Sequence, residues 1–527
     1  MTVETAPVVP QARPARPEAP APPAGRPWPA VVRRCVLVPL VVLIPLVTLT
    51  PGADHRFNVY ANGGLYASRP WQMVGTAVES VPQYLRLGNF RPLGRIVEWS
   101  LDLLAFAMTG LLGVPANISL RLVSFAAAIV LTLAAVVFAE SVTARGRLFA
   151  GTPSVLVAVV PFAVGIGFVA AGRTSTTVLF GGLYFLSATL VLAVAAAACR
   201  ATRLDWPRAL LFVFAGAALA AFNEMAALAL PLAAAAVLVR ERMVLAHPWR
   251  AALRRPGVRA AVLLWLGFLP VFLPVRALIY AICAHGACYP GSDVALPGAP
   301  AALPNRLAAW LPPLMWQRAA DGTHLRLIGV LPILALLVLA LLARGAARQL
   351  PRLATLDRRQ SFGLATVAAV ALLLGAALAA LNSDLQTLAR QGVWGQGWRE
   401  SGLTSAAGGV LVLALAVARC RRWAAAALVP LVVAGAIGVA ANKAVRDGSS
   451  GGSYPYLHDR IAQEIADFDP TPAGDARRCV LRALFIKSSV ASHHGVADQR
   501  ELERIDMSLN RATRQLDGRR FCSKAPR

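Results

Sequence analysis

Eleven apolar segments, separated by short clusters of arginine, constrain this chain more than any other feature. A helix needs about 20 apolar residues to cross about 30 Å of hydrocarbon. This window selects residues 34–50, 118–140, 152–171, 175–197, 208–222, 225–240, 259–281, 326–343, 362–381, 405–419 and 423–441. The pattern predicts an all-α polytopic membrane protein with about 11 transmembrane helices, followed by a small extracytoplasmic α/β C-terminal segment.

The composition supports burial in lipid. Hydrophobic residues make up 57% of the chain and charged residues only 15%, whereas a soluble domain carries roughly 25% charged residues. The formal net charge is +26, which can indicate nucleic-acid binding. Here the arginines lie between apolar segments, as the positive-inside rule describes. We therefore expect membrane lipid as a partner and no nucleic acid.

The chain divides into three expected regions. Residues 1–33 are rich in Pro and Ala and predict a disordered cytoplasmic tail. Residues 34–441 form the transmembrane region. Residues 442–527 form the extracytoplasmic C-terminal domain, in which apolar spacing predicts helices at 458–468 and 498–516 and a strand at 479–486.

The stretch from Arg208 to Arg240 decides the topology. As one helix it would be about 48 Å long, and Glu224 would lie near the membrane centre at a cost of roughly 2.5–3.5 kcal/mol. Arginines flank both ends, so both ends belong on the cytoplasmic side. Two short spans or a re-entrant hairpin satisfy this condition, with a turn at Asn223-Glu224. The predicted protein is a multi-pass protein of the cell (inner) membrane, with its N-terminus cytoplasmic and its C-terminus extracytoplasmic.

The seven cysteines fit this sidedness. Cys283 and Cys288 share one outer loop, and Cys479 and Cys522 share the outer tail. Disulfides persist in oxidising compartments, so the predicted sidedness indicates two outer disulfides. Half of a metal site remains the alternative for the first pair. The other three cysteines lie at inner helix ends and are expected to be free thiols: Cys35, Cys199 and Cys420.

The first outer loop, residues 51–117, contains the strongest candidate site. Asp54 and His55 follow the first span, and Arg56, Arg91 and Arg95 lie in the same loop. A carboxylate can take a proton from a hydroxyl or bind a divalent cation such as Mg or Mn. Arginines can hold a phosphate through paired hydrogen bonds. The combination predicts a phosphate-handling site, although Asp54 as a solvated helix-end residue is the open alternative.

Two further residues join the candidate site. Glu224 is expected either as a second carboxylate beside the first loop or as a capping group for the following helix. Trp398, in the outer loop at 382–404, could stack on a sugar ring or anchor the membrane interface. The amphipathic stretch at 101–112 is expected to lie in the interface before the second span.

Three short motifs resemble one family. Asp54 closely follows the first span, Arg91-Pro92-Leu93 comes late in the first loop, and Asn223-Glu224 separates two short spans. These features resemble the GT-C superfamily, the polytopic glycosyltransferases that use polyprenyl-phosphate-linked sugars. The likeness covers roughly residues 34–441. A lysine is common in the family where this chain has Asn223, and a second acidic residue is common where it has His55.

The resemblance implies an inverting hexosyl or pentosyl transfer from a polyprenyl-phosphate donor to a glycan or lipid acceptor of the cell envelope, on the outer face. Catalytic roles would fall to Asp54 as general base and to Glu224 as the group that orients donor or acceptor. The substrate-binding residues implied or expected are His55, Arg56, Arg91, Arg95 and Trp398.

Two other classes of function remain open. A transporter or lipid flippase needs ionisable groups near the membrane midplane, and the predicted spans are almost free of charge apart from Glu224. A non-enzymatic envelope scaffold that acts through its outer tail is the second. The sequence contains no glycine-rich phosphate loop of the usual form.

Overall fold

The computed structural model is built from helices, and its described residues contain no strand. It describes residues 28–49, 58–114, 116–146, 148–149, 151–172, 174–284, 288, 294–321, 325–449, 457–491 and 499–524. Within these ranges the only β-type pairings are isolated bridges, at Ser154–Ala354 and Val294–Asn382.

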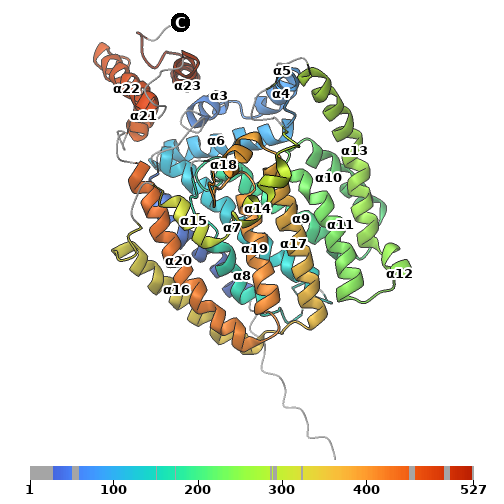
Figure 1. The fold of residues 1–527 in the computed structure, drawn as a ribbon. Helices are drawn as coiled ribbons and strands as arrows, with labels where there is room; N and C mark the ends of the chain where they lie inside the picture. Colours follow the sequence, from blue (N-terminus) through green and yellow to red (C-terminus); the bar gives the residue numbers. More distant parts are fainter. Residues whose placement is uncertain are drawn as a thin grey trace, which may run out of the picture.

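Long apolar helices form the body of the protein (Figure 1). In the described part of the chain seven helices are long and apolar enough to cross a membrane, and the protein is therefore an all-α, multi-pass membrane protein. They are α1 (Trp28–Leu43, continued by a 3-10 turn), α7 (Ala116–Thr143), α9 (Gly181–Arg200), α13 (Pro256–Cys283), α16 (Val330–Gln349), α17 (Arg358–Ala380) and α20 (Arg421–Ser449).

Four shorter apolar helices complete the bundle. They are α8 (Leu156–Gly165), α10 (Trp206–Ala220), α11 (Ala229–Val239) and α19 (Ser401–Ala416). Each of the eleven predicted segments thus contains one helix. A helix of 10 to 16 residues falls short of the length that a full crossing needs, so the count of about eleven crossings stays a prediction.

The predicted break near Asn223 is present. Helix α10 ends at Ala220, and a 3-10 turn leads into α11. The Asn223 side chain accepts a 2.8 Å hydrogen bond from the Ala226 backbone N–H and donates a 2.7 Å hydrogen bond to Ser187 on α9. Asn223 therefore caps the turn and fastens it to a neighbouring helix.

Helix α6 (Pro92–Leu112) lies across one end of the bundle, which we call the α6 end (Figure 1). It starts well before the predicted stretch at 101–112, because Pro92 suits the first helical position. Four short elements precede α6 in the chain. They are the π-turn η2 (Val59–Gly63) and helices α3 (Gly64–Tyr66), α4 (Gln72–Glu79) and α5 (Val81–Arg86). Leu111 is 83% exposed, which suits the interfacial placement that the sequence predicts.

Short helices fill the remaining connections. Helix α14 (Ala299–Ala308) packs on α17 and on α18 (Ser383–Arg390), and α15 (Pro312–Ala319) packs on α20. Helix α12 (Trp249–Leu253) follows a π-turn, η4 (Arg240–Val244), and lies at the opposite end from α6 (Figure 1).

The C-terminal unit is helical, and the predicted strand at 479–486 is wrong. The unit contains α21 (Leu457–Ala466), α22 (Pro472–Ala491) and α23 (Gln499–Asp517), and the expected strand lies inside α22. A short apolar run fits either a strand or a buried helix. Here Leu481 and Phe485, four residues apart, are both buried in the unit's core, which is the spacing of a helix face.

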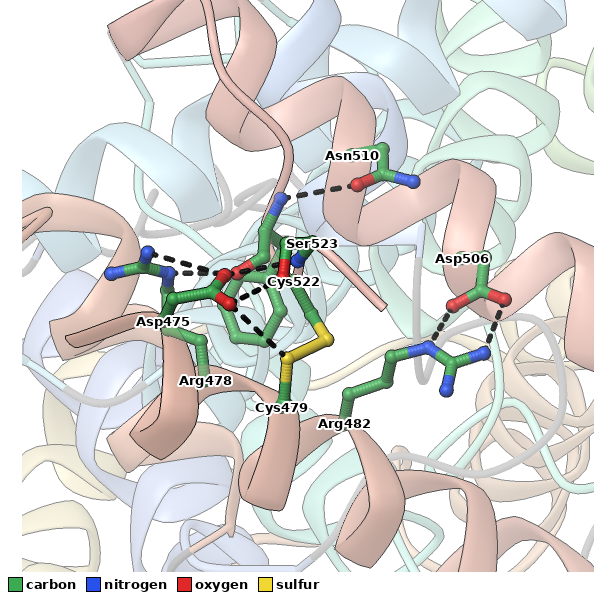
Figure 2. Close-up of a disulfide and its surroundings, with 9 residues drawn as sticks. Asp475, Arg478, Cys479, Arg482, Asp506, Asn510, Cys522 and Ser523 are labelled. Carbon is green, nitrogen blue, oxygen red and sulfur yellow. Dashed lines mark hydrogen bonds and ion pairs between the residues drawn. A yellow bond between two sulfur atoms is a disulfide. The ribbon is translucent and has the colours of Figure 1, made fainter. Parts of the chain in front are cut away.

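A disulfide closes this unit (Figure 2). Cys479 on α22 is bonded to Cys522, which follows α23. Beside it, Asp475 accepts hydrogen bonds from the backbone and hydroxyl of Ser523, and Arg478 donates to the Phe521 carbonyl at 2.7 Å. These contacts tie the segment after α23 to α22.

The C-terminal unit packs on the segment that follows the first span. Its α23 contacts η2 and α3, and its α21 contacts α6 and α7. Val59 and Tyr60 of η2 and Ala105 of α6 share one buried cluster with Phe485 and Ile505 of the unit. The unit is therefore docked on the α6 end by an apolar core.

Candidate functional site

Close backbone packing fixes the start of α6 against the end of α10. The Leu93 N–H donates a 3.0 Å hydrogen bond to the Ala221 carbonyl. A Cβ atom on Gly94 would lie 2.1 Å from the Phe222 carbonyl oxygen, so only glycine permits this approach. The Arg-Pro-Leu-Gly sequence therefore carries Arg91 to the turn that holds Glu224.

Glu224 lies at the centre of a cluster of arginines. Its side chain is 34% exposed, and its Oε1 is 3.8 Å from a guanidinium nitrogen of Arg276 on α13. Arg399 and Arg91 also act on it electrostatically. Burial by itself would raise the pKa of the Glu224 carboxyl, but the three arginines outweigh it and the pKa is lowered.

The loop that supplies Arg399 is held by buried polar contacts. Arg306 on α14 forms an ion pair with Glu400, and each side chain is 1% exposed. The Thr176 hydroxyl donates to the Trp398 carbonyl at 2.7 Å. These contacts fix the loop on both sides of Arg399.

The Arg399 guanidinium also makes cation–π contacts with two aromatic rings. Its guanidinium carbon lies 4.9 Å from the ring centroid of Trp398 and 5.7 Å from that of Tyr184 on α9. Tyr184 in turn hydrogen-bonds Arg91. Trp398 therefore lies at the edge of the arginine cluster, and its role in stacking on a sugar or anchoring the interface stays a prediction.

An apolar pocket adjoins Glu224. Its walls come from α10, α13 and the residue before Arg91, and they include Phe90, Phe268, Phe272 and Val275 together with Glu224 and Arg276. The pocket offers charged groups at one side and aromatic and aliphatic carbon at the other. The cavity volume is about 10 Å³, which is about the size of one water molecule, so the structure shows a small recess beside the charged cluster.

Two buried carboxylates on α6 were missed by the sequence analysis. Glu98 lies 3.1 Å from a guanidinium nitrogen of Arg95 and 4.0 Å from one of Arg91. Asp102, one helical turn further on, is 3% exposed and accepts a 2.7 Å hydrogen bond from Asn62 of η2. Burial, and next the charge of Glu98, raise the pKa of Asp102 well above its usual value. The spacing of four residues is the signal that places both on one helix face.

Three predicted site residues, Asp54, His55 and Arg56, lie outside the described residues. The structure ends on their N-terminal side at Leu49, whose carbonyl accepts a 3.4 Å hydrogen bond from Arg121, and resumes at Asn58. Among the other predicted site residues, the structure brings Arg91, Arg95, Glu224 and Trp398 to the α6 end.

Arg276 is a site residue that the sequence analysis overlooked. It is the one arginine inside the apolar interior of the seventh predicted span. An ionisable residue inside such a span is itself a signal of function. Arg276 also lies 5.2 Å from the ring centroid of Phe272, one turn earlier on α13, so it belongs to both the charged and the apolar side of the pocket.

Four of the seven cysteines form disulfides in the structure. Cys283 and Cys288 are bonded to each other, and Cys35, Cys199 and Cys420 are free. Within the ranges that the structure describes, His, Cys, Asp and Glu side chains do not gather in groups of three or more.

Comparison of the chain with protein-family models, with curated proteins and with solved structures finds no match.

Proposed function

We propose that this protein is a membrane glycosyltransferase of the GT-C type. It moves a hexosyl or pentosyl group from a polyprenyl-phosphate donor to an acceptor of the cell envelope, on the outer face of the membrane. The donor head would be bound at the α6 end, beside Glu224.

One observation carries the proposal. Arg91, Arg276 and Arg399 come from three distant parts of the chain and converge on Glu224 at the rim of an apolar pocket. Arg91 is shared with Glu98, and Arg276 and Arg399 together still exceed by one positive charge what Glu224 needs for neutrality. The excess positive charge suits a phosphate, and the aromatic wall suits the hydrocarbon chain attached to it.

The proposed chemistry is an inverting displacement. The acceptor hydroxyl oxygen attacks the anomeric carbon of the donor sugar, while the bond from that carbon to the phosphate oxygen breaks and its electron pair stays on the phosphate. Asp54 takes the proton of the hydroxyl. The leaving polyprenyl phosphate gains negative charge, which the arginines stabilise more strongly than they stabilise the donor.

Glu224 has a separate role in this proposal. Its carboxylate keeps the guanidinium groups oriented toward one point and lowers the net charge of the empty site. When a phosphate arrives, the arginines have hydrogen-bonding capacity left for it. Binding of Mg or Mn would be the alternative role of the Asp54 carboxylate, in place of proton transfer.

The proposed orientation places the N-terminus in the cytoplasm and the α6 end outside. It is supported by the two disulfides, which belong to that end or to the unit docked on it, since disulfides persist in oxidising compartments.

The direct test is transfer of a labelled sugar by the purified protein from a panel of polyprenyl-phosphate hexoses and pentoses. We expect transfer from one of them and its loss in Asp54→Asn and Glu224→Gln. Asp384→Asn, an exposed carboxylate in the first turn of α18, is the matched control. Wild-type rates in Asp54→Asn would remove the general base, and lack of lipid-phosphate binding by wild-type protein would refute the function.

A further inference from the structure

The Cys283–Cys288 disulfide rests directly on Gly88. Gly88 follows α5 and has a φ of +76°, a conformation that favours glycine. A Cβ atom at this position would lie 3.1 Å from the sulfur of Cys283 and 3.1 Å from the sulfur of Cys288. The turn after α5 and the end of α13 are therefore in contact through a glycine and two sulfur atoms.

The chain between Gly88 and Gly94 is held at both ends. At Gly88 it meets the disulfide, and at Gly94 it meets the Phe222 carbonyl. Between these two contacts lie Phe90, which lines the pocket, and Arg91, which interacts electrostatically with Glu224. The two glycines thus bracket the residues that the first loop contributes to the site.

The disulfide also lies on the helix that supplies another site residue. Arg276 precedes Cys283 on α13 by seven residues, or about 10 Å along the axis. The first loop supplies Arg91 and α13 supplies Arg276, and both arginines act electrostatically on Glu224. Packing of Gly88 against the disulfide at the end of α13 therefore joins the two segments that carry these arginines.

We infer that the Cys283–Cys288 disulfide is a positioning group for the lipid-phosphate site, which acts through Gly88 to hold Phe90 and Arg91 against α13. The consequence for lipid binding rests on the proposed function. The mechanical role of the disulfide does not, and the two are tested separately.

The mechanical role is tested by hydrogen exchange on the full chain in lipid nanodiscs. In Cys283→Ser/Cys288→Ser we expect amides of residues 86–96 to exchange severalfold faster. Cys479→Ser/Cys522→Ser, which breaks the other disulfide, is the matched control and should leave these amides unchanged. Equal exchange in wild type and Cys283→Ser/Cys288→Ser overturns the inference.

A second variant tests the contact itself. Gly88→Ala places a methyl group against both sulfur atoms and also strains the backbone at a φ of +76°, so it should accelerate exchange in residues 86–96. The backbone strain is the same with or without the disulfide, whereas the sulfur contact is not. When it is combined with Cys283→Ser/Cys288→Ser, its added effect should be smaller, because the rigid sulfur pair is gone. Strictly additive effects would show that the glycine and the disulfide act independently and would overturn the inference.

The functional consequence is measured as binding of polyprenyl monophosphate. We expect about tenfold weaker binding in Cys283→Ser/Cys288→Ser and no change in the control pair, which also loses one disulfide. Unchanged binding together with faster exchange would overturn the link to the site. If wild-type protein binds no polyprenyl phosphate, the proposed function fails, while the exchange experiment still decides the mechanical role.

Discussion

Arg306 and Glu400 are separated by 94 residues in the chain and form an ion pair with both side chains 1% exposed. Removing one partner of a buried pair leaves an uncompensated charge and costs about 3–5 kcal/mol. We therefore expect Glu400→Gln to lower the unfolding temperature markedly and to weaken polyprenyl-phosphate binding through the displaced Arg399. Arg306→Met combined with Glu400→Leu should recover most of the stability. A Glu400→Gln protein of wild-type stability would contradict this role.

Arg276 should contribute strongly to phosphate binding. A hydrogen bond to a charged group contributes about 1.5–3 kcal/mol, and each 1.4 kcal/mol changes affinity about tenfold. Arg276→Ala should therefore weaken binding of polyprenyl phosphate by about 10- to 100-fold, measured by microscale thermophoresis. Arg259→Ala, an exposed arginine near the other end of α13, is the matched control. Equal affinities in the two variants would remove Arg276 from the site.

Two glycines of α6 should respond in opposite directions to alanine. Gly94→Ala forces a methyl group onto the Phe222 carbonyl, and overpacking of this kind costs about 1–3 kcal/mol. Gly110→Ala meets nothing within 4 Å and should stabilise the helix by about 0.5–1 kcal/mol. Thermal unfolding of the two variants in one detergent separates these effects. If both variants lose the same amount of stability, the contact of Gly94 with the Phe222 carbonyl does not explain the loss.

The C-terminal unit should loosen in acid. Hydrogen bonds from Thr471 and Arg477 lower the pKa of Asp469 to about 2, and hydrogen bonds from Ser523 help to lower that of Asp475. A lowered folded-state pKa gives stability that is present above the ordinary value near 3.8 and lost as the pH falls through the folded-state value. Because acid protonates the phosphine and slows all reductions, the measured quantity is the reduction rate of Cys479–Cys522 divided by that of Cys283–Cys288. We expect this ratio to rise as the pH falls from about 4 to about 2.

The reduction rate of Cys283–Cys288 in the same sample is the internal control, since neither carboxylate contacts it. Asp469→Asn should give part of the acceleration already at neutral pH. If the ratio of the two reduction rates does not change with pH, these carboxylates do not hold the unit closed.

The proposed orientation makes a labelling prediction. Val480 is 59% exposed on the C-terminal unit, so Val480→Cys should react with a membrane-impermeant maleimide added to intact cells. Cys420, at the start of α20, is the internal control and should react only after the cells are opened. Labelling of Cys420 first would reverse the topology and remove the outer-face site.

The helices were predictable because each apolar run carries its own signal. The break at Asn223-Glu224 was predictable for the same reason: one helix through Glu224 costs too much in the membrane. The strand at 479–486 was wrong because its apolar run is short and fits two periodicities. Residues 479–486 are helical because Leu481 and Phe485 pack against other helices of the folded unit. The local sequence does not reveal these neighbours.

The site was predictable only in part. Arg91 and Glu224 could be proposed as partners from sidedness, but their contact depends on Gly94, whose importance appears only when the Phe222 carbonyl is in place. Arg276 could have been found as a charge inside an apolar span. Arg399 could not, because its position is fixed by Arg306 and Glu400, two residues that no local pattern connects.

The docking of the C-terminal unit on η2 and α6 has a consequence for biosynthesis. Tyr60 is synthesised roughly 400 residues before Leu457. At a synthesis rate of about 5–20 residues per second, the interval is on the order of tens of seconds. During that interval the apolar face of η2 has no partner from the unit. The nascent protein must therefore shield this face with lipid or a chaperone, and the α6 end can mature only after translation has passed the unit.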